Sequence, residues 1–139
     1  MVSELAAAAG GSVRCGIDTV EIIRIERLLR DTPPADLGKL FSAHELEDAG
    51  DGPGRAGSLA ARFAAKEAAL KVLRPRDGGI PWSAIEVRRD PGGWVEMELS
   101  GAAADLAEAA GVAELAVSLS HEGGFASAVV IAELRPSSR

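Results

Sequence analysis

The densest group of chemically useful side chains lies in one Ala- and Leu-rich segment near the middle of the chain. Residues 55–76 contain six Lys or Arg side chains and a single acid, Glu67, so this segment carries a net charge of +5 in a protein of formal charge −6. Solubility does not require such an asymmetry, and clustered cations are the groups that bind phosphates. The alternative is a solvated helix with a Glu67–Lys71 pair, which would contribute about 0.3–0.5 kcal/mol.

A second acid, Asp18, directly follows the short apolar run 13–17. Such a run predicts a buried strand, which would present the Asp18 carboxylate at the edge of the core. Asp18 could simply cap a helix that begins after it. Paired with Glu67 it would instead bind Mg²⁺, which accepts one or two protein carboxylates and completes its coordination with water and substrate phosphates.

A third candidate is the predicted strand end at residues 117–122, which carries Ser120 and His121 ahead of two glycines. A His in this position is commonly exposed and without function. The sequence pattern alone leaves both interpretations open.

The elements that would position these side chains follow from periodicity and turn signals. Helices are predicted over 19–30, 37–49, 59–73 and 102–110, the second weakly, with Ser58 as N-cap of the third after a glycine-rich loop. Strands are predicted over 13–17, 84–89, 94–99, 114–120 and 126–134, with a hairpin turn at 90–93. This order predicts an α+β domain in which helices cover one side of a small antiparallel sheet.

Length and composition limit the class of protein. The 139 residues are enough for one domain, predicted over 13–135, with residues 1–12 as a flexible extension. No apolar stretch approaches the roughly 20 residues that span a bilayer, and no secretory signal is evident, so we expect a cytoplasmic protein that does not bind membranes. The negative charge argues against nucleic-acid binding. The single Cys15 excludes an intramolecular disulfide and is expected to be buried.

Taken together, four motifs resemble the holo-acyl-carrier-protein synthase family, the short type of 4′-phosphopantetheinyl transferase. Their order and spacing agree over residues 13–134. The motifs are Gly16-Ile17-Asp18 with Glu21 and Arg24, Phe41-Ser42-x-x-Glu45, Arg62-Phe63-Ala64-Ala65-Lys66-Glu67-Ala68-x-x-Lys71, and Ser118-Leu119-Ser120-His121. The first and third motifs together are specific evidence for this family, whereas either motif alone would be weak evidence.

The resemblance implies a role for each candidate residue. Asp18 and Glu67 would bind Mg²⁺, and Lys71 would lie beside the coenzyme A pyrophosphate. Other side chains would hold the coenzyme, namely Arg62, Lys66, Ser120 and His121. Arg24 would contact the acidic acyl-carrier protein, and Arg27 and Arg30 extend the same basic stripe. The family also implies a homotrimer with each active site at a subunit interface.

The implied reaction is the Mg²⁺-dependent transfer of 4′-phosphopantetheine from coenzyme A to a serine of an acyl-carrier protein, releasing adenosine 3′,5′-bisphosphate. It would serve fatty-acid, other lipid or polyketide biosynthesis. Either a metal-bound water or Glu67 would accept the serine proton. One departure leaves an alternative open, because the hairpin has Gly92-Gly93-Trp94-Val95 where the family usually has Gly-Lys-Pro or Gly-Arg-Pro, so both the cation and the proline are missing. The alternative is a non-catalytic module that binds coenzyme A or the carrier. A third hypothesis is a purely structural oligomerisation domain.

Overall fold

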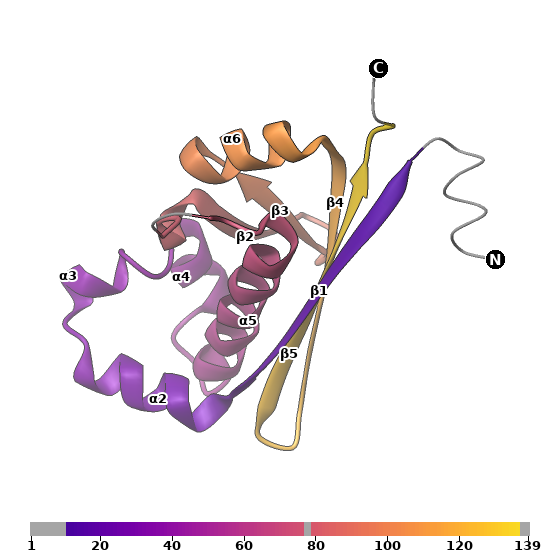
Figure 1. Cartoon of the computed structure of the whole chain (residues 1–139). Coiled ribbons are helices and arrows are strands. Elements are labelled where there is room, and N and C mark those ends of the chain that lie inside the picture. The colour runs from indigo at the N-terminus through magenta and orange to yellow at the C-terminus, as the bar shows by residue number, and fades with distance from the viewer. Residues whose placement is uncertain (1–10, 77–78, 137–139) are drawn as a thin grey trace.

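The chain folds into two antiparallel sheets and five α-helices over residues 11–76 and 79–136, the part that the computed structural model describes (Figure 1). The elements in chain order are β1 (Ser12–Glu21), α2 (Ile22–Asp31), α3 (Pro34–Leu37), α4 (Ala43–Ala49), α5 (Arg55–Leu73), the short 3₁₀ turn η1 (Trp82–Ala84), β2 (Ile85–Arg89), β3 (Val95–Leu99), α6 (Gly101–Ala110), β4 (Val112–Glu122) and β5 (Phe125–Leu134). The predicted α+β class and antiparallel pairing are confirmed.

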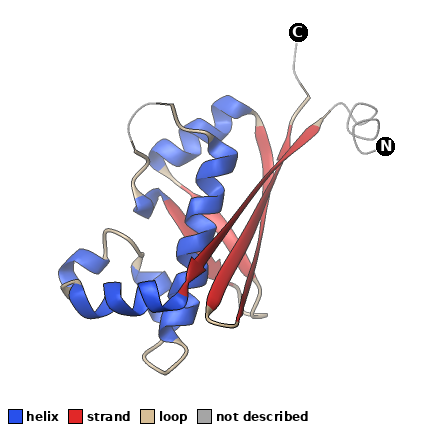
Figure 2. Cartoon of the chain, turned by 60° about the horizontal axis from the view of Figure 1, so that its bottom comes forward, coloured by secondary structure: helices blue, strands red, loops and turns tan. Residues whose placement is uncertain are grey.

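The larger sheet has the strand order β1-β5-β4, and β2 and β3 form a separate two-stranded hairpin. Figure 2 shows the helices gathered on one side of the larger sheet. In these described residues the other face of that sheet carries no helix. This agrees with the predicted one-sided arrangement.

Helix α5 is the central element and packs against both β1 and β5. Its Ala-rich sequence favours a helix and keeps the side chains on its packed faces small. Six alanines are almost completely buried: Ala60, Ala61, Ala64, Ala65, Ala68 and Ala69. The helix ends where Arg74 adopts a left-handed conformation before Pro75, and Arg14 Nη1 on β1 donates to the Val72 carbonyl at 3.1 Å. Such an arginine satisfies a carbonyl that the helix end leaves free.

The backbones of β1 and α5 touch at Gly16. A Cβ atom at this position would lie 2.2 Å from the Ala68 carbonyl oxygen, so only glycine fits without a shift of one element. Asp18 lies two residues further along β1 and therefore on the same face of the strand. The close approach thus brings Asp18 to the surface of α5.

The face of the larger sheet that lacks helices is partly apolar. Ile17 is 62% exposed, and Val13, Phe125 and Ile131 are also exposed. Cys15 belongs to this face, so the prediction that it is buried is wrong. An apolar run indicates a strand buried on both sides only when both faces of the sheet are covered, and here successive residues alternate between a covered and an open face.

Several predicted boundaries differ from the structure. Strand β1 runs to Glu21 instead of ending at Ile17, because it pairs with β5 along its whole length. Helix α5 begins at Arg55 with Gly54 as N-cap, so Ser58 does not cap it. The segment 37–49 contains the end of α3 and all of α4. The proposed extension falls mostly on residues 1–10, outside the described residues, although Ser12 already belongs to β1. No helix of the described chain is both long and apolar enough to cross a membrane.

Candidate functional site

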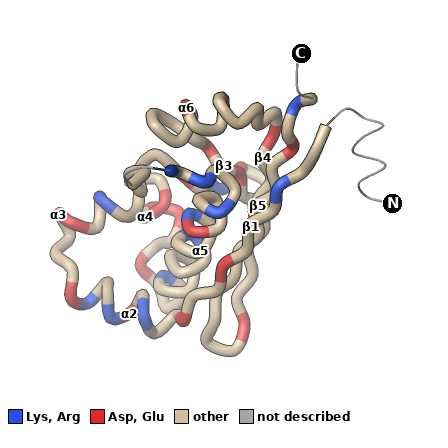
Figure 3. The backbone as a smooth tube through the Cα atoms, in the orientation of Figure 1, with Lys and Arg blue, Asp and Glu red and all other residues tan. Residues whose placement is uncertain are grey.

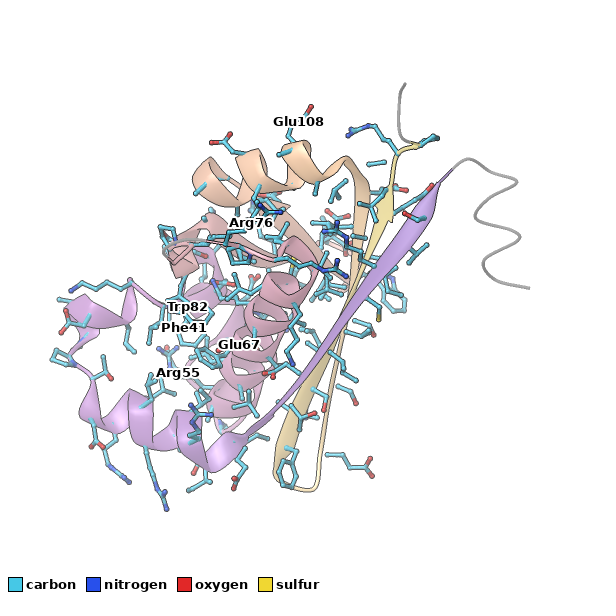
Figure 4. All side chains as sticks on the ribbon, in the orientation of Figure 1. Phe41, Arg55, Glu67, Arg76, Trp82 and Glu108 are labelled. Atoms are coloured by element: carbon cyan, nitrogen blue, oxygen red, sulfur yellow. The ribbon has the colours of Figure 1, made fainter. Side chains whose placement is uncertain are left out.

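Three predicted site residues meet where β1 crosses α5. Lys71 Nζ donates to the Ile17 carbonyl at 2.6 Å and lies 3.5 Å from Asp18 Oδ1. Glu67, which Figure 4 labels near the middle of α5, precedes Lys71 by one helical turn. Residues four apart share one helix face. The β1–α5 junction therefore places Asp18 against Lys71, with Glu67 one turn away on the same face of α5.

This donor set fits a magnesium ion that arrives with a phosphorylated substrate. Asp18 and Glu67 offer the hard oxygen atoms that Mg²⁺ prefers, and substrate phosphates and water can complete its octahedron. In the described residues, no three or more acidic, His or Cys side chains are grouped so as to hold a metal ion by themselves. The junction therefore does not resemble an all-protein structural metal site.

Three of the other predicted coenzyme contacts lie around a cavity of about 610 Å³. Its walls come from α4, the first half of α5, the β2–β3 hairpin and the end of β4. The fold brings together three of the residues predicted to hold the coenzyme, because this cavity is lined by Arg62, Ser120 and His121. Its lining also includes Ser118 and Trp94, which belong to the fourth motif and to the altered hairpin, and Asp48 and Arg89, to which the sequence assigns no role.

Arg62 lines the cavity and has two hydrogen-bond donors without a partner. Its side chain is only 2% exposed, and Nη1 donates to the carbonyl and hydroxyl oxygens of Ser58. Nε and Nη2 are buried without a hydrogen-bond partner, although Nη2 is 4.0 Å from Asp48 Oδ2. Burial, reinforced by Arg89, lowers the pKa of Arg62, and Asp48 and Glu45 oppose this shift. A buried unpaired donor costs about 1–3 kcal/mol, and an anion that formed a hydrogen bond with Nε or Nη2 would remove this cost.

Lys66 does not offer its charge to a ligand, which corrects its predicted role as a coenzyme contact. The side chain is fully buried. Its Nζ lies 2.8 Å from Glu45 Oε1 and donates to the carbonyls of Trp82 and Ile85. These contacts use all three N–H bonds of the ammonium. Burial lowers the pKa of Lys66, and Glu45 raises it.

The Glu45 carboxylate links α4 to both neighbouring elements. Besides Lys66, it accepts the backbone N–H groups of Ser42 at 2.8 Å and Val87 at 3.0 Å. One turn later on α4, Asp48 accepts the backbone N–H of Arg89 at 3.1 Å. Two carboxylates of one helix thus hold alternate amides along β2. The position of the hairpin, and of its side chains at the cavity, therefore depends on α4.

The sequence signal for this contact was the capping box of α4, in which Ser42 and Glu45 bond reciprocally. In the sequence, Ser42-x-x-Glu45 belongs to the second motif of the family resemblance. It predicts where α4 starts, but it does not reveal that Glu45 also pairs with Lys66.

The predicted site residues form two separate groups in the chain. Asp18, Glu67 and Lys71 do not line the cavity that contains Arg62 and His121. Arg62 and Glu67 are five residues apart on α5, which separates their side chains by about 140° around the helix axis. A single chain therefore does not gather all of them into one site.

The basic stripe on α2 is exposed, as its spacing predicts. Arg24, Arg27 and Arg30 all lie on the solvent side, and the apolar face of the helix buries Ile25. Figure 3 shows Lys and Arg positions recurring along α2. Arg30 lies 3.5 Å from Asp31, and no salt bridge is found for Arg24 or Arg27 within the described chain.

Comparison with known proteins gives the class of this chain. Residues 14–130 match the family model described as the 4′-phosphopantetheinyl transferase superfamily. The holo-[acyl-carrier-protein] synthase of Trichlorobacter lovleyi is 47% identical over 120 residues, covering 85% of this chain and 94% of the relative. That of Streptomyces coelicolor is 46% identical over 118 residues, with the same coverage.

Solved structures agree with the sequence matches. A Chronobacterium ammoniagenes ACPS–CoA complex superposes with a TM-score of 0.77 at 32% identity, covering 89% of this chain and 98% of the other. The Helicobacter pylori holo-[acyl-carrier-protein] synthase in complex with coenzyme A gives 0.74 at 30% identity, with coverage of 86% and 99%. The chain therefore belongs to the 4′-phosphopantetheinyl transferase superfamily, in the holo-acyl-carrier-protein synthase group that its motifs predicted. It is a transferase.

Proposed function

We propose that this enzyme transfers 4′-phosphopantetheine from coenzyme A to a serine of an acyl-carrier protein and requires Mg²⁺. The observation that carries the proposal is the β1–α5 junction, where Asp18 contacts Lys71 one turn from Glu67. A carboxylate beside an ammonium, with a second carboxylate on the same helix face, would suit a dication bound to a diphosphate. Two similar proteins of known structure are complexes with coenzyme A, which supports the choice of this substrate.

In the proposed reaction, the serine oxygen forms a bond to the phosphorus that carries the pantetheine arm. The bond from that phosphorus to the bridging oxygen breaks, and adenosine 3′,5′-bisphosphate leaves with the electron pair. The serine proton passes to the Glu67 carboxylate or to water. Phosphoryl transfer depends mainly on positioning and on stabilising the charge of the phosphate oxygens. Lys71 would supply such a charge at the junction, and Arg62 would bind an anionic group of the coenzyme in the cavity.

Asp18 and Glu67 would hold the magnesium ion. When bound, Mg²⁺ neutralises the pyrophosphate oxygens and so makes the phosphorus a better electrophile.

The direct test is to incubate the protein with coenzyme A, Mg²⁺ and an apo-carrier from either fatty-acid or polyketide synthesis, and to measure the mass of the carrier. We expect the carrier to gain the mass of one phosphopantetheine group, and adenosine 3′,5′-bisphosphate to appear in equal amount. An unchanged carrier mass with several carriers would instead support a non-catalytic binding module.

We also propose that the active enzyme is a homotrimer in which each site is completed by a second copy of the chain. Two features support this. The predicted site residues fall into two groups on different sides of α5, and the open face of the larger sheet exposes apolar side chains such as Ile17. Contact between copies would cover this face and bring the Asp18 group of one chain to the Arg62 group of another.

Shared sites predict complementation between two inactive variants. Chains carrying Glu67→Gln and chains carrying His121→Ala should each be nearly inactive as pure assemblies. Random mixed assemblies, produced by co-expression, should regain about one quarter of the wild-type activity, because one quarter of the sites combine two intact halves. Sedimentation should show three chains per particle. Mixed assemblies as inactive as the pure variants would contradict a site shared between copies.

The basic stripe on α2 is proposed to bind the acidic carrier protein. Arg24→Glu should therefore raise the KM for the carrier about tenfold, a change of roughly 1.4 kcal/mol, and leave the KM for coenzyme A almost unchanged. The effect should decrease as salt screens the charges.

A matched control is Arg76→Glu, which makes the same change in net charge at an exposed position near α6, away from α2 (Figure 4). It should leave the KM for the carrier unchanged. Equal effects of the two variants would show that total charge matters and that α2 is not the docking surface.

A further inference from the structure

The hairpin between β2 and β3 carries the most exposed aromatic side chain among the described residues. Trp94 is 77% exposed and borders the same cavity as Arg62 and His121. Isolated exposed apolar residues are ordinary on protein surfaces and need no explanation. This one is unusual because it lines the same cavity as a guanidinium whose buried Nε and Nη2 have no hydrogen-bond partner.

The turn holds Trp94 in a defined place. Its backbone N–H donates to Asp90 Oδ1 at 3.0 Å, and its carbonyl accepts the Asp90 N–H at 2.8 Å. Gly93 has a φ of +88°, a left-handed conformation that glycine adopts more readily than other residues. Its N–H donates to the Asp90 carbonyl. The five-membered ring of the indole lies close to Gly92, since a Cβ there would be 3.4 Å from Trp94 Cδ1. The backbone that carries Trp94 is therefore fixed by hydrogen bonds of the turn, and the residue lines the cavity.

The cavity thus combines cations with an aromatic surface. Arg62 and Arg89 line it, and a ligand with anionic groups would pair with them. A ligand that also carries a planar base would cover the indole, because every base has a face that can stack on an aromatic ring. Coenzyme A has both features, in its phosphates and its adenine ring.

We propose that Trp94 provides the stacking surface for the adenine ring of coenzyme A. The inference rests on the proposed function, since it takes coenzyme A as the substrate. It makes Trp94 an affinity-determining residue that acts on the nucleotide end of the coenzyme and does not touch the reacting phosphorus.

The binding test uses the fluorescence of the indole itself. The chain has two Trp residues, so the variant Trp82→Phe leaves Trp94 as the only one. This change keeps an aromatic ring against Phe63, whose ring centroid is 5.1 Å from that of Trp82. Titration with adenosine 3′,5′-bisphosphate should quench the Trp94 emission in a saturable way, whereas inorganic pyrophosphate, which lacks a base, should leave it nearly unchanged.

Affinity measurements complete the test. Trp94→Ala should raise the Kd for adenosine 3′,5′-bisphosphate by roughly 5- to 150-fold, the range expected for loss of one stacked base, and should leave the Kd for pyrophosphate unchanged. Trp94→Phe should retain most of the affinity. Wild-type affinity in Trp94→Ala would overturn the proposal, as would a change in the number of chains per particle, which would assign Trp94 to a subunit contact.

These outcomes differ from a failure of the proposed function. If the wild-type protein does not modify any carrier, the transferase reaction fails, yet quenching by the nucleotide would still support stacking. If Trp94→Ala binds the nucleotide normally while the wild type modifies its carrier, only the stacking proposal fails.

Discussion

Glu67→Gln is expected to lower turnover by about 100- to 1000-fold, because a metal contributes several kcal/mol of charge stabilisation and each 1.4 kcal/mol corresponds to a factor of ten. The amide has almost the shape of the carboxylate but lacks its charge. It would therefore weaken the binding of Mg²⁺ without removing packing. The rate of carrier modification at saturating substrates measures the effect, and the Mg²⁺ concentration needed for half-maximal rate should rise.

Glu108→Gln on the exposed surface of α6 provides the matched control, since it removes the same charge far from the β1–α5 junction (Figure 4). Its turnover should equal that of the wild type. Both variants should unfold at nearly the wild-type urea concentration. Full activity in Glu67→Gln would remove this carboxylate from the proposed metal site, and Asp18 would then lack the second protein ligand.

Lys66→Met is expected to destabilise the fold by about 3–5 kcal/mol, the usual cost of leaving one charge of a buried pair without its partner. The Glu45 carboxylate would keep the Ser42 and Val87 amides but lose the ammonium at 2.8 Å. Combining the change with Glu45→Gln should recover part of the loss, because the neutral amide can still accept a hydrogen bond. Urea unfolding of both single variants and the double variant, at one protein concentration, measures the coupling.

The exposed ion pair between Lys39 and Asp36, at 3.3 Å, is the control. Lys39→Met should change the free energy of unfolding by no more than about 1 kcal/mol, as is typical of surface pairs. A Lys66→Met effect as small as this would show that the buried pair does not stabilise the chain. If Lys66→Met does not fold, Glu45→Gln alone keeps the comparison possible.

The sequence predicted the elements whose signals are local. The hairpin of β2 and β3 follows from alternation on either side of a turn rich in Pro and Gly, and α6 ends at Gly111, which adopts a left-handed conformation. Boundaries that depend on pairing were missed. The β-branched residues Thr19 and Val20 are compatible with a strand, but two residues are too short a signal to set its end. Pairing with β5, more than 100 positions away, extends β1 to Glu21.

The same distinction applies to the site. A cluster of cations predicted an anion-binding segment, but spacing on a helix does not say which face turns inward. Lys66 and Arg62 are one turn apart and both are buried, yet Lys66 is neutralised by Glu45 whereas two donors of Arg62 have no partner. Only the packing of α4 against α5 and β2 determines this difference, and α4 was the weakest helix in the sequence.

The contact of α4 with β2 has a consequence for local opening of the chain. A hairpin of two strands is marginal in water on its own, and here the outward amides of Val87 and Arg89 are bonded to side chains instead of a third strand. Hydrogen exchange at these two amides should therefore report undocking of α4 without global unfolding. When α4 undocks, the bare strand edge becomes a template on which other chains can pair, so the carboxylates of this short helix also protect the protein from aggregation.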